Sequence, residues 1–136
     1  MDSRNDNMII ITVALNACIV VLAGHGISIL GILEYFWFPF INSDYFSLNI
    51  FSSYDSNIAA ACAFSFAGQS SMIISLFFRN KRFLHFFVVV GLVASSIGFL
   101  YLVHGTLFGG LGSSLSLLTG IPYVAAAARM TMVVFR

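Results

Sequence analysis

Residues 79–104 read RNKRFLHFFVVVGLVASSIGFLYLVH, a basic turn followed by 22 residues without a single Asp, Glu, Lys or Arg. A bilayer core is about 30 Å thick, and a helix needs roughly 20 residues to cross it. Charges gathered at one end of an otherwise apolar stretch are typical of a transmembrane helix that leaves the membrane at that end. We therefore predict that residues 83–104 cross a membrane.

Three other apolar stretches reach the same length, at residues 8–33, 57–78 and 112–134. The chain as a whole is 60% apolar and only 8% charged, whereas a soluble domain is about 25% charged. This composition excludes an ordinary soluble domain and a disordered chain. We predict an all-α integral membrane protein, with residues 1–136 forming one domain, a bundle of four transmembrane helices.

The basic residues gather at one set of helix ends. They are Arg4, Arg79, Lys81, Arg82, Arg129 and Arg136. The connection at residues 34–56 carries Glu34, Asp44 and Asp55 and no basic residue. Because short loops rich in Lys and Arg stay on the cytoplasmic side, we expect both termini to be cytoplasmic and residues 34–56 to lie outside.

The connection at 34–56 is rich in aromatic residues. The candidate anchor or docking residues among them are Tyr35, Trp37, Phe38, Tyr45 and Tyr54. Such rings favour the level of the lipid headgroups, so we expect the segment to lie along the outer membrane surface as an anchor, in part as an interfacial helix near residues 43–52. The alternative is a docking surface for a partner subunit.

Small residues recur at helical spacing in the predicted spans. Helices in lipid associate through close contact, and small residues mark where they meet. The third span has Gly91, Gly98 and Gly105, and the second has Ala59, Ala63 and Ala67. We expect these positions to form helix-packing stripes.

Two amide side chains fall within the apolar stretches. Asn16 and Gln69 each lie roughly 12–15 Å from the inner surface at 1.5 Å per residue, so they could hydrogen-bond to each other. Their role is either to fix helix register or to provide a polar lining for a permeating solute. No carboxylate is expected inside a span, since Glu34 falls at the outer end of the first.

Two histidines, His25 and His104, fall in the outer half of the predicted bundle. A facing pair could ligate the iron of a haem b, and the glycines beside His25 would leave room for the macrocycle. A proton-coupled or quinone-contacting His25 is another hypothesis. Without such a pairing we expect no cofactor, and no metal pattern is present in the sequence.

The sequence contains no nucleophile–base pattern, phosphate loop or basic run typical of nucleic-acid binding. We therefore expect neither an enzyme nor a nucleic-acid-binding protein. The leading hypothesis is a non-catalytic accessory subunit or modulator of a larger membrane protein complex. The alternatives are a homo-oligomeric small transporter or channel, and a haem- or quinone-binding subunit of an electron-transfer complex. The expected location is a bacterial inner membrane, with an organellar membrane as the alternative.

Overall fold

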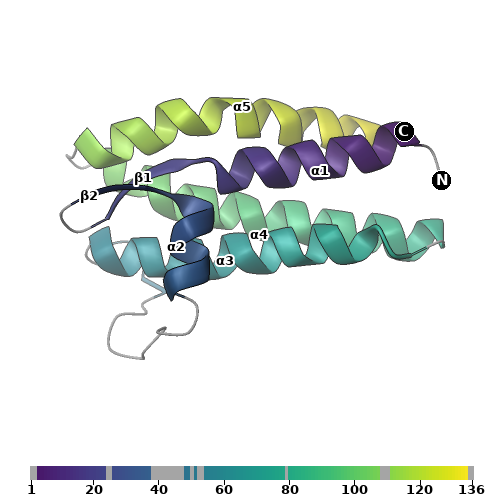
Figure 1. The fold of residues 1–136 in the computed structure, drawn as a ribbon, viewed down its shortest axis with the longest axis horizontal. Helices are drawn as coiled ribbons and strands as arrows, with labels where there is room; N and C mark the ends of the chain where they lie inside the picture. The colour runs from purple at the N-terminus through teal and green to yellow at the C-terminus, as the bar shows by residue number, and fades with distance from the viewer. Residues whose placement is uncertain are drawn as a thin grey trace.

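The computed structural model describes residues 3–23, 26–37, 48–49, 51, 54–78, 80–107 and 111–134. Helices α1, α3, α4 and α5 run alongside one another, and the short helix α2 crosses in front of α3 (Figure 1). The elements are α1 (Ser3–Ala17), β1 (Val20–Ala23), β2 (Gly26–Ile29), α2 (Leu30–Trp37), α3 (Tyr54–Ser75), α4 (Lys81–Leu107) and α5 (Leu111–Val134).

Three of the described helices are long and apolar enough to cross a membrane. The qualifying segments are Ser56–Ser75, Lys81–His104 and Ser114–Val134. They coincide with the predicted spans at 57–78, 83–104 and 112–134, so the sequence-based prediction of a helical membrane protein is confirmed at these three places.

The predicted continuous helix over residues 8–33 is wrong. Helix α1 ends at Ala17, and at 15 residues it is only about 22 Å long. The chain then forms an antiparallel hairpin in which Val20 pairs with Ile29 and Ala23 with Gly26. The sequence favours this break, because the β-branched residues Ile19, Val20, Val21, Ile27 and Ile29 lie on either side of the sequence Gly-His-Gly at 24–26.

The backbone of the hairpin forms hydrogen bonds between its two strands and with side chains of α5. The Val20 N–H donates to Thr119 Oγ1 at 3.0 Å, and the Ser116 hydroxyl donates to the Val20 carbonyl at 2.8 Å. The Leu30 N–H donates to the Ile19 carbonyl at 2.8 Å and extends the ladder. Extended backbone is tolerated at membrane depth only where protein or a hydrated cavity provides such partners.

Helices α3 and α4 have the most extensive contact in the molecule, and glycines make it possible. A Cβ added at Gly68 would overlap the Ser95 hydroxyl and lie 2.7 Å from the Gly91 carbonyl oxygen. A Cβ at Gly98 would lie 2.9 Å from the Ala61 carbonyl oxygen. The two backbones therefore meet with no space for a side chain at these crossings.

The predicted packing stripes are right for α4 and misplaced on α3. Gly91 and Gly98 both face α3, whereas the surroundings of Gly105 lie outside what the structure describes. Ala59 is buried, Ala63 is half-buried and Ala67 is exposed. The α3 residues that meet α4 are instead Ala61, Ser65, Gly68 and Met72.

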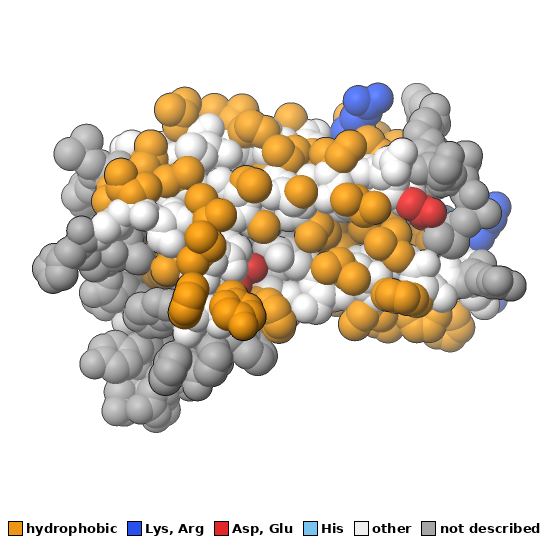
Figure 2. Space-filling model, viewed as in Figure 1, with side chains coloured by type: hydrophobic (Ala, Val, Ile, Leu, Met, Phe, Trp, Pro, Cys, Tyr) orange, Lys and Arg blue, Asp and Glu red, His pale blue; other side chains and the backbone are white. Residues whose placement is uncertain are grey.

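Both chain ends and the turn between α3 and α4 lie at the same end of the bundle (Figure 1). The described basic residues Lys81, Arg82 and Arg129 belong to this end, where Figure 2 shows the Lys and Arg side chains. The rest of the visible face is dominated by apolar side chains, as expected for a surface covered by lipid tails.

Only part of the predicted aromatic connection at 34–56 is described. Residues 34–37 belong to α2, where Tyr35 is exposed. The side chains of Trp37 and Tyr54, the residues Phe38 and Tyr45, and most of the expected interfacial helix at 43–52 lie outside the described residues. Leu48 is tied to the bundle, because its carbonyl accepts a 2.7 Å hydrogen bond from the Tyr101 hydroxyl.

Candidate functional site

A cluster of three polar side chains lies inside the bundle. The Gln69 amide nitrogen on α3 donates to Asn16 Oδ1 of α1 at 3.0 Å and to Glu34 Oε1 of α2 at 3.1 Å. Both hydrogens of one NH₂ group are thereby used, and three elements are joined at one point. The hydrogen bond expected between Asn16 and Gln69 is present, whereas Glu34 is an additional member.

Glu34 was expected at the outer end of the first span, but the structure places it inside the bundle. Glu34 is only 3% exposed. The hairpin reverses the chain direction, so α2 returns along the bundle and brings Glu34 beside Gln69 rather than to the outer end of a span.

Burial governs the chemistry of this carboxyl group. Glu34 belongs to α2, which is not one of the three spanning helices. Removal from water raises the pKa of Glu34 to about 8, and the hydrogen bond from Gln69 opposes this only weakly. No Lys, Arg or His side chain in the described part of the chain forms an ion pair with it or lowers its pKa. The neutral, protonated form is therefore favoured at and below neutral pH.

Further polar atoms in the core lack partners. In the described part of the chain, Asn16 Nδ2, Ser65 Oγ, Ser95 Oγ and the Tyr123 hydroxyl are buried without a hydrogen bond. The residues that carry them are at most 1% exposed. The Tyr123 hydroxyl lies near Asn16, Ser95 and Ser96, but at a geometry that makes no hydrogen bond.

Three of the residues with unpartnered atoms, Asn16, Ser95 and Tyr123, lie close to one another, and Asn16 is itself one of the three bonded side chains. Ser95 of α4 faces Gly68, the residue next to Gln69. Cys62 of α3 is close enough to Glu34 for their charges to interact. Helices α1, α3, α4 and α5 together with α2 thus contribute to one polar core, which we call the Glu34 cluster: Asn16, Glu34, Gln69, Ser95 and Tyr123.

The donor set of the Glu34 cluster suits a proton or ordered water better than a metal ion. No group of three or more His, Cys, Asp or Glu side chains comes together among the residues described. The Asn16 and Glu34 oxygens that a metal would use already accept hydrogen bonds from Gln69. Hydroxyl groups can both donate and accept, so Ser95 and Tyr123 can hold water beside the carboxyl.

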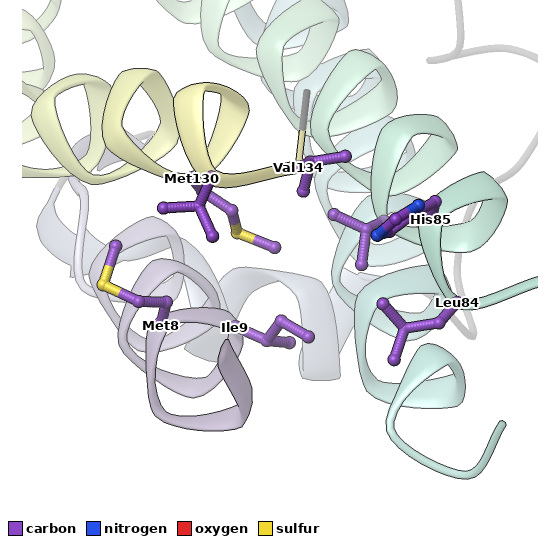
Figure 3. A pocket seen from close by; sticks show the side chains of 8 residues that line it. Met8, Ile9, Leu84, His85, Met130 and Val134 are labelled. Atoms are coloured by element: carbon purple, nitrogen blue, oxygen red, sulfur yellow. The ribbon is translucent and has the colours of Figure 1, made fainter. Parts of the chain in front are cut away.

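His85 and His104, the two histidines that the structure describes, do not join this cluster. His25 lies outside the described residues, so its proposed pairing with His104 stays a prediction. The His104 ring packs edge-on against Phe51, with ring centroids 5.0 Å apart. His85 is at the basic end, at the rim of a small cavity into which Ile9, Leu84 and Met130 point (Figure 3). That cavity has room for about one water molecule and is otherwise apolar.

One feature of the sequence could have predicted the burial of Glu34, although a hydropathy profile does not detect it. Two short segments rich in β-branched residues, on either side of Gly-His-Gly at 24–26, predict a hairpin. A hairpin in the first apolar stretch would have turned Glu34 inward. The function of the cluster has to be inferred from this geometry alone. No family model, curated protein or solved structure matches the chain.

Proposed function

We propose that this protein moves a small cation across a membrane, working as an assembly of identical copies. The observation that carries the proposal is the burial of Glu34 in hydrogen-bond contact with Gln69. An ionisable group inside a membrane bundle is costly, and such groups mark ion pathways and proton relays. Because four short membrane segments seldom enclose a route alone, the path runs through an oligomer.

The broken first apolar segment supports the same proposal. Transporters commonly build their ion sites where a membrane helix is interrupted and polar side chains lie beside the interruption. Here α1 ends at Ala17, one residue after Asn16, and the chain continues as a hairpin. The basic end of the bundle faces the cytoplasm in this proposal, and the membrane is the inner membrane of a bacterium.

Replacing the buried carboxyl tests the proposal directly. In liposomes containing the purified protein, a potassium gradient with valinomycin drives cation entry, and enclosed dyes report protons and sodium. We expect wild-type protein to raise the influx of one of these ions. Glu34→Gln should lower that influx at least about tenfold, because the amide can neither exchange a proton nor carry the negative charge that attracts another cation.

Asp6→Asn is the matched control, since Asp6 lies on α1 ten residues before Asn16, about 15 Å along the helix. This variant should conduct like the wild type. Wild-type influx no faster than that of protein-free liposomes, for both ions, would contradict the proposal. So would equal influx in wild type and Glu34→Gln.

A second candidate function is that of an accessory subunit in a larger membrane complex, and the outer face of α5 favours it. Leu118, Ile121 and Met132 are 65%, 57% and 64% exposed. A shallow groove between α4 and α5 is lined in part by Ser96, Ala127 and Ala128. Small residues of this kind allow another helix to approach closely.

Purification of a tagged chain in mild detergent, with mass spectrometry of what accompanies it, tests this candidate. We expect a larger membrane protein to co-purify in a fixed ratio with the chain. It should no longer co-purify when Ala128→Phe fills the groove. It should still co-purify with the control Ala67→Phe, on the exposed face of α3. A chain that always purifies without a partner counts against it. A haem absorption band in the same sample would favour the subunit with His25 and His104 as haem ligands.

A further inference from the structure

Among the residues that the structure describes, the Glu34 carboxyl accepts a hydrogen bond from the side-chain amide of Gln69. The Cys62 thiol on α3 is a described titratable group that interacts with it. The Tyr123 hydroxyl on α5 lies near Asn16, which shares the Gln69 amide with Glu34. The described basic side chains Lys81, Arg82 and Arg129 all belong to the far end of the bundle. An ionised carboxylate in this position would be a buried charge without a counter-ion, which is strongly unfavourable.

The unpartnered polar atoms of the cluster require partners of their own. A buried donor or acceptor without a hydrogen bond costs about 1–3 kcal/mol. Buried water molecules usually satisfy such groups, making two to four hydrogen bonds each. Asn16 Nδ2, Ser95 Oγ and the Tyr123 hydroxyl come from three different helices and lie around the same core. Water bonded to these three atoms would lie in the polar core that Gln69 joins, through Asn16, to Glu34.

We propose that the cation exchanged at Glu34 is a proton, and that water held by Asn16, Ser95 and Tyr123 delivers it. The inference rests on the proposed cation transport and names its substrate. Binding forms one O–H bond at the carboxylate and breaks one in a protonated water molecule, and release reverses this. No electron moves and no further reactant is needed. A sodium or magnesium ion would require several free oxygen ligands, and Gln69 already occupies two of those present.

Infrared difference spectroscopy of the purified protein measures this protonation without any transport. Between about pH 5 and about pH 10, the wild-type protein should lose the carbonyl stretch of one protonated carboxyl and gain that of a carboxylate. The change should be absent in Glu34→Gln and retained in Asp6→Asn. A wild-type spectrum without a protonated carboxyl anywhere in this range would overturn the inference, even if a variant failed to fold.

The water molecules are tested by two further variants. Tyr123→Phe and Ser95→Ala each remove one hydroxyl, so each should shift the frequency of the Glu34 carboxyl band and the pH at which it disappears. Ser71→Ala is the control, because the Ser71 hydroxyl bonds to the Phe87 carbonyl outside the cluster. If the band is the same in both variants as in the wild type, the hydrated site is refuted.

The spectra and the liposome assay separate the two proposals. A Glu34 band that titrates in a protein that conducts no ion contradicts the transport function and supports the proton site. Sodium influx that depends on Glu34, in a protein whose carboxyl never becomes protonated, supports transport and overturns the proton as its substrate.

Discussion

Gly68→Leu should destabilise the protein by about 3 kcal/mol, and we expect it to separate α3 from α4. The reason is that the atoms facing Gly68 are mostly backbone. A Cβ at this position would lie 2.7 Å from both the Gly91 carbonyl oxygen and the Ser95 amide nitrogen. A flexible side chain could turn aside, but these backbone atoms can move only if the whole helix moves.

Ala67→Leu is the matched control, one residue earlier on the same helix. Ala67 is exposed, so the added carbon atoms enter lipid or detergent and cost little. Denaturation of the purified variants in increasing sodium dodecyl sulfate, followed by the loss of helical circular dichroism, gives the two free energies of unfolding. Equal stability of Gly68→Leu and Ala67→Leu would show that α3 and α4 do not approach this closely.

The packing stripe on α3 shows what small-residue spacing can and cannot predict. A four-residue ladder through Ala59, Ala63 and Ala67 was the most regular pattern in the sequence, yet Ala67 faces outward. The contact follows Ala61, Ser65, Gly68 and Met72, with steps of four, three and four residues. A helix has 3.6 residues per turn, so strict steps of four drift off one face, whereas mixed steps stay on it.

The three long spans could be predicted because hydropathy measures what they need, namely length and absence of charge. The first apolar stretch met the same criteria and still formed a hairpin, because hydropathy gives Ile and Val the same weight in a strand as in a helix. The misplacement of Glu34 followed from that one error. The Asn16–Gln69 bond was predictable, since it needed only the depth of each residue along its own helix.

Raising the pH should weaken the folded state, and Glu34 should be the main cause. Burial raises the pKa of this carboxyl from 4.5 to about 8. Between those two values the folded protein holds a proton that the unfolded chain has released. The free energy of unfolding therefore falls as the pH rises through this window, by up to roughly 5 kcal/mol in all. The contribution is complete below about pH 4.5 and is lost above about pH 8.

Thermal unfolding of the purified protein in detergent, repeated across this pH range, measures the effect. The wild-type curve alone does not isolate Glu34, because the chain carries other ionisable side chains. Glu34→Gln removes the buried carboxyl and leaves the other ionisable groups in place, so its unfolding temperature should decline much less than that of the wild type over this range. Asp6→Asn should decline like the wild type. Parallel curves for wild type and Glu34→Gln would mean that the carboxyl is ionised in the folded protein. Its charge would then need a cation other than a proton beside it, because a lone buried carboxylate is too costly to persist.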